Sequence, residues 1–186
     1  IVTVTVILIC TAVFISSCEL DVTDDNAIRM LDSMNPQKRI EATRTLGELG
    51  DPLATEPLIC ALEDKNDDVR MYAVWALGEI GDPRAVDLFV GIVLNGSWKH
   101  EEAIEALEKI GDPRAVDALI EIMQDSTLEL SIRGRAVNAL GEIGDPRAVE
   151  PLLMFLEYKN STERDDVILA LGKIGDTRAV EPLEEV

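Results

Sequence analysis

The sequence predicts an all-α solenoid built from stacked helix pairs. The first observation is a sequence motif that occurs in five similar copies, at 46–58, 77–89, 107–119, 140–152 and 171–183. The second is its nearly constant period of roughly 30 residues, a spacing typical of stacked supersecondary units. This period is read from the glycine before each aspartate, at Gly50, Gly81, Gly111, Gly144 and Gly175. The third is that residues 24–186 show none of the alternation typical of strands.

Each copy of the motif predicts the end of one helix and the start of the next. In the second copy, Leu77 and Ile80 lie at helical spacing, and Gly81 suits the left-handed conformation that ends a helix. Asp82 can cap the next helix by accepting from free backbone N–H groups. Pro83 lies at the first helical position, where its missing N–H costs nothing. We therefore expect the second helix of each repeat (helix B) to turn tightly into the first helix of the next (helix A).

Repeat 2 shows the predicted plan of one unit. Helix A covers about 52–62, the loop 63–68, and helix B about 68–80. Apolar and small residues fall on one side of this helix B, at about 100° per residue: Val69, Ala73, Ala76, Leu77 and Ile80. We expect that side to face the core.

The chain divides into a segment 1–17, a short acidic linker 18–23 and a repeat domain 24–186. The repeat domain consists of repeats 24–50, 51–81, 82–111, 112–144 and 145–175, followed by a half-repeat 176–186. A helix A without its helix B leaves an apolar face open, and solenoid ends need a polar capping unit. We therefore expect further repeats to follow in the natural protein.

The motif GDPRAVEPL, followed by D-x-x-V-R and A-x-x-A-L-G-E-I-G, resembles the HEAT-like repeats named after the phycobilisome (PBS) lyases. The resemblance covers 24–186. It implies a right-handed α-solenoid (superhelix) of antiparallel helix pairs, with the B helices on the concave side. It says less about function, because a fold alone does not fix function.

The N-terminal segment 1–17 carries no charge and precedes Cys18. Its last residues, from Ile15 to Cys18, resemble the cleavage site of a bacterial lipoprotein signal. The resemblance implies removal of 1–17, lipidation of Cys18 and a membrane-associated, extracytoplasmic protein. A signal normally opens with Met and a basic segment, so we expect the natural chain to begin a few residues earlier. The alternative is an uncleaved anchor, although the segment is marginal in length against the roughly 20 apolar residues that a bilayer requires.

The composition is strongly acidic, with 36 acidic against 17 basic residues and a net charge of −19. This charge argues against nucleic acid as a partner, because such binding depends on cationic contacts with phosphate. It favours a basic partner or divalent cations, or else only solvated helix faces. Cys60 is the one cysteine beyond Cys18, and we expect it to be a small buried residue without a disulfide.

One pair of residues resembles catalytic chemistry. His100 and Glu101, at the start of helix B in repeat 3, are similar to the His-Glu pairs that the repeats of deoxyhypusine hydroxylase offer to a di-iron centre. However, His100 is the only histidine, and a metal site needs several convergent ligands. Arginine holds the equivalent position in the other repeats, as Arg39, Arg70, Arg133 and Arg164. We therefore expect His100 to replace a structural arginine that bonds to a loop, with no metal and no cofactor.

The B helices of repeats 2 and 3 carry the candidate binding surface. Met71 and Trp75 lie opposite the core side of their helix, with Tyr72 beside them, and such residues are typical interface anchors. The equivalent positions of repeat 3 are Glu101, Glu102 and Glu105. We predict an aromatic patch bordered by acid that binds a protein with a basic segment. The alternative is that Trp75 packs on the neighbouring helix B and is half-buried.

The sequence therefore predicts a non-enzymatic scaffold for protein–protein interaction, tethered to a membrane. No glycine-rich phosphate loop, Ser/His/Asp set or Cys/His metal spacing occurs. The alternatives are an accessory subunit or lyase-like enzyme acting on a bound small molecule, in the manner of a bilin lyase, or a structural spacer in a longer chain.

Overall fold

The computed structural model describes residues 22–94, 100–157 and 161–184. The described residues form helices, turns and bends without a strand, which confirms the all-α fold. The predicted signal 1–17 and Cys18 lie outside them. None of the helices in the described ranges is long and apolar enough to cross a membrane. The chain divides into two compact units that meet in sequence between Ala85 and Val86.

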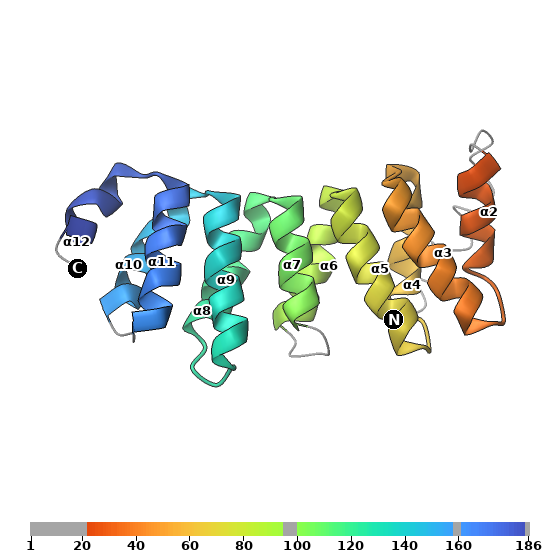
Figure 1. The fold of residues 1–186 in the computed structure, drawn as a ribbon, viewed down its shortest axis with the longest axis horizontal. Helices are drawn as coiled ribbons and strands as arrows, with labels where there is room; N and C mark the ends of the chain where they lie inside the picture. The colour runs from red at the N-terminus through yellow and green to blue at the C-terminus, as the bar shows by residue number, and fades with distance from the viewer. Residues whose placement is uncertain (1–21, 95–99, 158–160, 185–186) are drawn as a thin grey trace. The chain divides into compact units, whose positions relative to one another are not determined.

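Unit 1 is a set of antiparallel helix pairs (Figure 1). Its helices are α2 (Val22–Met30), α3 (Pro36–Leu49), α4 (Thr55–Ala61) and α5 (Asp67–Ile80), with one-turn 3₁₀ helices η1 (Pro52–Ala54) and η2 (Pro83–Ala85). The B helices α3 and α5 pack side by side, while α2 packs against α3 and α4 against α5. The unit therefore has two helical layers.

Unit 2 repeats this plan. Its helices are α6 (Val86–Leu94), α7 (His100–Ile110), α8 (Val116–Gln124), α9 (Leu130–Ile143), α10 (Val149–Glu157), α11 (Ser161–Ile174) and α12 (Val180–Glu184), with 3₁₀ helices η3 (Pro113–Ala115), η4 (Pro146–Ala148) and η5 (Thr177–Ala179). The B helices α7, α9 and α11 pack in succession, and α6, α8 and α10 each pack against their own B helix. Both units are segments of an α-solenoid.

The joints between repeats follow the predicted chemistry. In unit 2, α7 ends at Gly111, which has a φ of 66° and donates its N–H to the carbonyl of Leu107 at 3.0 Å. The Asp112 carboxylate accepts from the N–H of Arg114 at 2.9 Å. Helix A differs from the prediction in its first turn, which is 3₁₀ because the N–H of Ala115 donates to the carbonyl of Asp112, three residues back.

Small residues bring neighbouring B helices into close contact. A Cβ added to Gly141 of α9 would lie only 2.8 Å from the Cα of Ala170 in α11. The predicted core side of α5 is buried at Val69, Ala73, Ala76 and Leu77, whereas Ile80, in the last turn, is partly exposed.

Cys60 differs from the prediction. It lies on α4 between the buried residues Leu58 and Ala61, but its own position on the helix is only partly buried. Cys60 is therefore less buried than the sequence predicted.

Candidate functional site

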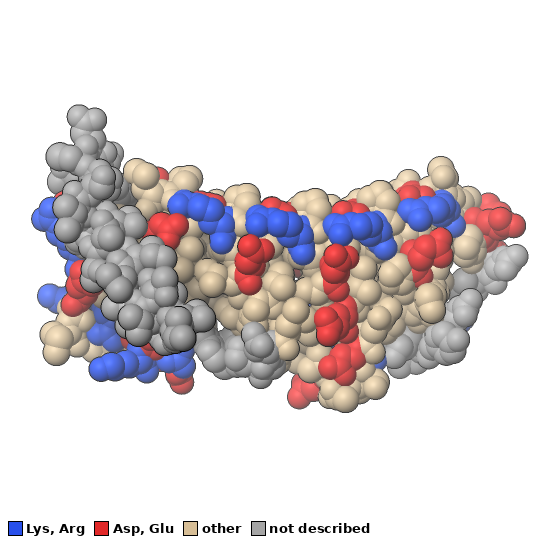
Figure 2. All heavy atoms as spheres, turned by 180° about the vertical axis from the view of Figure 1, so that it is seen from behind, with Lys and Arg blue, Asp and Glu red and all other residues tan. Residues whose placement is uncertain are grey.

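The arginine of the repeated motif ties a helix A to the repeat before it. In unit 2, Arg147 donates through Nη2 to the carbonyl of Pro113 at 2.6 Å and through Nη1 to the carboxylate of Asp117 at 3.3 Å. Arg178 repeats the first bond, donating to the carbonyl of Pro146 at 2.9 Å. Figure 2 shows basic side chains with acidic side chains directly beside them. The position of this arginine is therefore explained by packing between repeats.

The same arginines bind the aspartates that cap helix A. In unit 1, Arg84 donates to the Asp82 carboxylate through Nε at 2.9 Å and Nη2 at 2.5 Å. These bonds lower the pKa of Asp82 to about 2. Bonds from Arg178 likewise lower the pKa of Asp176 to about 2. This role was not predicted from the sequence, although the recurrence of arginine two residues after a capping aspartate was the available signal.

The aromatic candidates lie on α5 in unit 1. Tyr72 and Trp75 meet edge to face, with ring centroids 6.4 Å apart and an interplanar angle of 89°. Met71, Tyr72 and Trp75 are each partly buried. A Cβ on Gly47 of α3 would lie 2.6 Å from Cζ3 of Trp75, so the indole packs directly on α3. Trp75 therefore packs on the neighbouring B helix and is half-buried, and Tyr72 lies against the edge or face of its ring.

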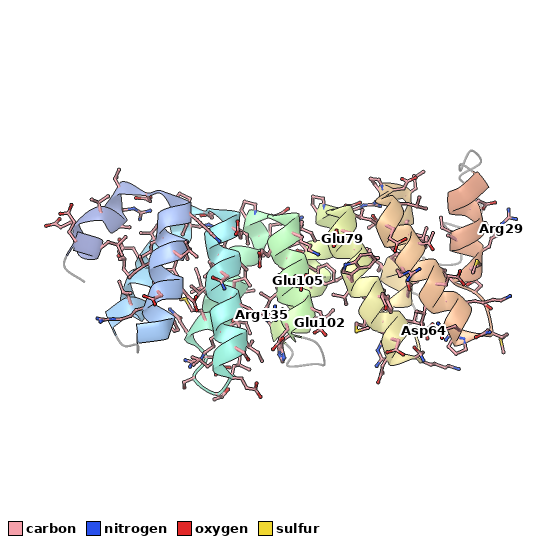
Figure 3. The ribbon with its side chains drawn as sticks, in the orientation of Figure 1. Arg29, Asp64, Glu79, Glu102, Glu105 and Arg135 are labelled. Atoms are coloured by element: carbon pink, nitrogen blue, oxygen red, sulfur yellow. The ribbon has the colours of Figure 1, made fainter. Side chains whose placement is uncertain are left out.

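The acidic candidates lie on α7 in unit 2, where Figure 3 shows Glu102 and Glu105 near Arg135 of α9. Glu101 is paired with that arginine, whose Nη2 lies 3.2 Å from Oε2 of Glu101. Glu105 is exposed and pairs only locally with Lys109, at 3.3 Å. The structure therefore places the three glutamates on one helix and pairs Glu101 with Arg135 of the next repeat.

A fourth glutamate of α7 shows how crowded this acidic face is. Burial raises the pKa of Glu108, and the charges of Glu142 and Glu105 raise it further. The charges of Lys173 and Arg135 act in the opposite direction. Lys173 is itself paired with Glu142 at 2.5 Å. We name the outward side of α7, α9 and α11, which carries these residues, the B-helix face of unit 2. Its carboxylates repel one another, although Lys173 and Arg135 lie nearby.

His100 begins α7 and is partly buried, at the position that Arg39 occupies in unit 1. Arg39 donates to the carboxylate of Asp64 and, at 2.8 Å, to the carbonyl of Ser33. Arginine at this position therefore bonds to loops. Within the described ranges, no group of three or more His, Cys, Asp or Glu residues could hold a metal ion, so His100 has no set of co-ligands there.

Comparison with known proteins places the sequence among repeat proteins. It matches the family described as HEAT repeats over residues 25–100 and 128–186, and the PBS lyase HEAT-like repeat over residues 100–125. No curated protein matches the sequence.

Several solved structures share the fold. A chain of the CpcE–CpcF complex of phycocyanin lyase from Nostoc sp. PCC7120 is 25% identical, with a TM-score of 0.69, and the match covers 91% of this chain and 70% of that one. A designed armadillo repeat protein in complex with the peptide (KR)4 is 19% identical, with a TM-score of 0.62 and 86% of both chains covered. Because the HEAT-repeat match covers more than half of the sequence, this chain belongs to the HEAT-repeat family.

Proposed function

We propose that this protein is a scaffold that binds a basic segment of a protein partner on the B-helix face of unit 2. The observation that carries the proposal is the gathering of Glu102, Glu105 and Glu108 on α7 beside Glu142 of α9, where burial and then repulsion from Glu142 and Glu105 raise the pKa of Glu108. A lysine or arginine brought to this face would relieve that repulsion. The net charge of −19 would also attract a basic partner over a longer range.

Three acidic side chains define the core of this proposed surface: Glu102, Glu105 and Glu108 of α7. Glu101 takes a different part, because its pairing with Arg135 holds that guanidinium beside the surface. Exposed ion pairs contribute only about 0.2–1 kcal/mol each, so useful affinity requires several contacts. We therefore expect an extended basic segment rather than a single charged residue.

Unit 1 offers a second surface of different chemistry. Tyr72 and Met71 are partly exposed beside Trp75, which is held in place by its packing on Gly47. A rigid aromatic pair loses little conformational freedom on binding, and aromatic residues are enriched among interface hot spots. We propose that these residues supply apolar contact to a protein partner.

The fold is compatible with this use. The designed armadillo repeat protein of the comparison holds the basic peptide (KR)4, and a second such design was made for modular peptide recognition. These proteins are 19% and 18% identical to this chain, so they show only that a solenoid of this kind can hold a peptide.

A fluorescent octapeptide of alternating lysine and arginine provides the test, with anisotropy as the readout. We expect saturable binding that weakens when salt is raised from about 50 to about 300 mM, since exposed charge pairs are screened. The double variant Glu105→Gln with Glu108→Gln should bind roughly 2- to 30-fold more weakly, as two such contacts would predict.

The matched control is Asp32→Asn with Glu63→Gln, which removes the same charge from exposed turns of unit 1. This variant should bind the peptide almost as well as the parent protein. Equal weakening in both double variants would mean that only the net charge matters, and the proposed surface would be wrong.

A second candidate function is that of an accessory subunit or lyase-like enzyme. It is favoured by the likeness to the phycocyanin lyase complex, which extends over 91% of this chain. A bilin added to the purified protein should then change its absorption spectrum in a saturable, stoichiometric way. A spectrum identical to that of the free pigment would count against this function.

We further propose that the protein is held at a membrane, extracytoplasmically, by lipid on Cys18. The support is the sequence pattern that ends at that cysteine. The lipidated protein should partition into detergent, and Cys18→Ala should abolish both the added mass and the partitioning. An unchanged mass and partitioning in this variant would contradict lipidation.

A further inference from the structure

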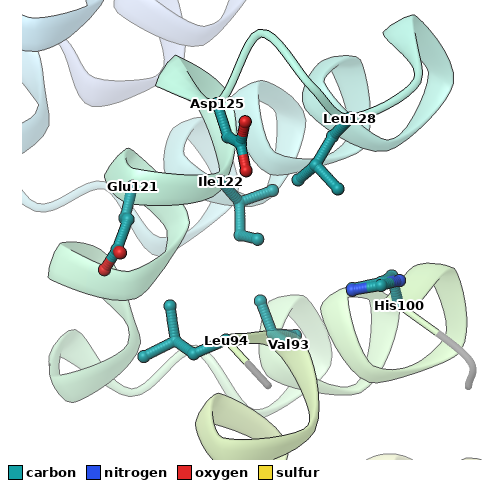
Figure 4. Close-up of a pocket in the computed structure, with 7 residues that line it drawn as sticks. All are labelled: Val93, Leu94, His100, Glu121, Ile122, Asp125 and Leu128. Atoms are coloured by element: carbon teal, nitrogen blue, oxygen red, sulfur yellow. The ribbon is translucent and has the colours of Figure 1, made fainter. Parts of the chain in front are cut away.

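A cavity in unit 2 lies where unit 1 holds an arginine side chain. Its volume is about 90 Å³, several times the roughly 10–15 Å³ that a single water needs. Figure 4 shows the lining residues, which come from α6, α7, α8 and the loop after α8: Val93, Leu94, His100, Glu121, Ile122, Asp125 and Leu128. The side chains of His100 and Asp125 reach toward the same space from opposite walls.

The equivalent place in unit 1 is filled. Arg39, in the first turn of α3, donates to Asp64 of the loop after α4 through Nε at 2.6 Å and through Nη2 at 2.8 Å, as a bidentate pair. Its Nη1 donates to the carbonyl of Ser33, six residues before it. The charge of Arg70 acts on the same carboxylate, so Asp64 faces two guanidinium groups.

Unit 2 keeps the acceptors of this arrangement but lacks one of the cations. His100 and Asp125 have the same separation along the chain as Arg39 and Asp64, and Arg133 acts on Asp125 by its charge as Arg70 acts on Asp64. Leu94, six residues before His100, is the last residue of α6, so its carbonyl has no partner within that helix. The missing group is the guanidinium of Arg39, because His100 stands at the equivalent position in unit 2.

The polar groups around the cavity suit a planar cation. Hydrogen bonds from Thr127 to one oxygen of Asp125, at 2.7 and 2.8 Å, lower the pKa of this carboxyl and keep it ionised. The Nε2 atom of His100 is buried and has no hydrogen-bond partner among the described residues. In the tautomer protonated on Nδ1, this atom is an acceptor. Glu121 adds a second, exposed carboxylate.

We infer that this cavity binds a guanidinium group supplied from outside the chain, in the place of the missing arginine side chain. The guanidinium forms a bidentate pair with Asp125, because fork-shaped donors match a carboxylate. Its remaining N–H groups bond to Nε2 of His100 and to the carbonyl of Leu94. An alkyl group attached to it contacts Val93 and Ile122. The donor is either a free alkylguanidinium or an arginine of a partner protein.

This site is separate from the B-helix face, so the inference does not rest on the proposed function. The first probe is methylguanidinium, added to the full chain with labelled methyl groups and followed by NMR. We expect saturable shifts of the methyl signals of Val93, Leu94, Ile122 and Leu128. Methylammonium and sodium chloride at equal concentration should not reproduce them, because neither offers the planar fork of donors.

Variants separate this site from unspecific effects. His100→Arg should fill the cavity from within, abolish the saturable shifts and raise the thermal unfolding midpoint. Asp125→Asn should weaken binding at least tenfold, whereas Glu129→Gln, an exposed residue of the same loop without a cap bond, should leave the affinity unchanged. Because Asp125→Asn also weakens the bonds to Thr127, the folded His100→Arg variant is the stronger test.

A second probe identifies the source of the guanidinium. A short peptide with one arginine between glycines should bind at least as tightly as methylguanidinium if a partner arginine is the ligand. Binding of methylguanidinium alone indicates a free small molecule. Shifts that do not saturate, that persist in His100→Arg, or that methylammonium reproduces would overturn the inference.

Discussion

Arg39 and Asp64 form a bidentate ion pair that joins the first turn of α3 to the loop after α4. The side chains are only 15% and 14% exposed, so water competes weakly for either group. The hydrogen bond from Arg39 also lowers the pKa of Asp64. Since Arg39 further donates to the carbonyl of Ser33 in the loop before its own helix, one side chain fixes the loop before α3 and the loop after α4.

Arg39→Lys should destabilise the protein by about 1–3 kcal/mol, because lysine cannot donate two parallel bonds to one carboxylate. Urea unfolding followed by circular dichroism provides the measurement. Arg44→Lys is the control, because Arg44 forms only an exposed pair with Glu48 at 3.4 Å and should change stability by less than about 0.5 kcal/mol. Equal losses in the two variants would contradict the special role of Arg39.

Two glycines of unit 2 should respond to alanine with opposite signs. Gly141→Ala would place a Cβ 2.8 Å from the backbone of Ala170 and should destabilise by about 1–3 kcal/mol. Gly172 lies within α11 with no atom near an added Cβ, so Gly172→Ala should stabilise by up to about 1 kcal/mol. Thermal unfolding midpoints measure both effects. A gain in Gly141→Ala would mean that α9 and α11 pack less closely than the structure shows.

Acid should remove the stability that Asp82 supplies. Its folded pKa of about 2 lies below the ordinary 3.8, so the contribution is complete above about pH 4 and is lost as the pH falls through 2. Asp82→Asn, which keeps a capping side chain, should therefore lower the unfolding free energy by up to about 2 kcal/mol at neutral pH and by little near pH 2. Urea unfolding of both proteins across this range is the measurement.

The control for this titration is Asp51→Asn. Asp51 caps helix A of repeat 2 in the same way, but Leu53 follows where Asp82 has Arg84. At neutral pH this substitution should lower the unfolding free energy by less than Asp82→Asn does, because no arginine side chain bonds to this cap. Equal losses in the two variants would mean that the contact with Arg84 is not the cause.

Glu108→Gln should stabilise the protein at neutral pH, because the raised pKa of Glu108 means that the fold disfavours its charge. The stability that this glutamate retains is present below its unfolded pKa and is lost as the pH rises through its folded pKa. The advantage of glutamine should therefore vanish near about pH 4. Urea midpoints at the two pH values decide this, with exposed Glu105→Gln expected to stay within about 0.5 kcal/mol.

The joints between repeats could be predicted because they are local. Gly81, Asp82 and Pro83 each act on backbone groups within a few residues, so the chain ends and restarts its helices where the sequence indicates. The 3₁₀ first turn was not predicted, because a capping aspartate followed by proline is compatible with either helix type.

The candidate surface was less predictable, because it depends on the register between helices. Glu101 and Arg135 lie in different repeats, and only the packing of α7 against α9 brings them within 3.2 Å. Trp75 could be placed on a face of α5, but its burial depends on Gly47 of another helix. The cavity at His100 becomes visible only when Asp125 is placed opposite it.

The hydrogen bonds from the arginine of the repeated motif also bear on how the number of repeats can change during evolution. Arg147 reaches back to Pro113, and Arg178 to Pro146, so each linkage joins one copy of the motif to the copy before it. A tandem duplication of one repeat carries both halves of this linkage and restores it on either side of the insertion. The gene can therefore gain or lose whole repeats without needing compensating substitutions at the new junction.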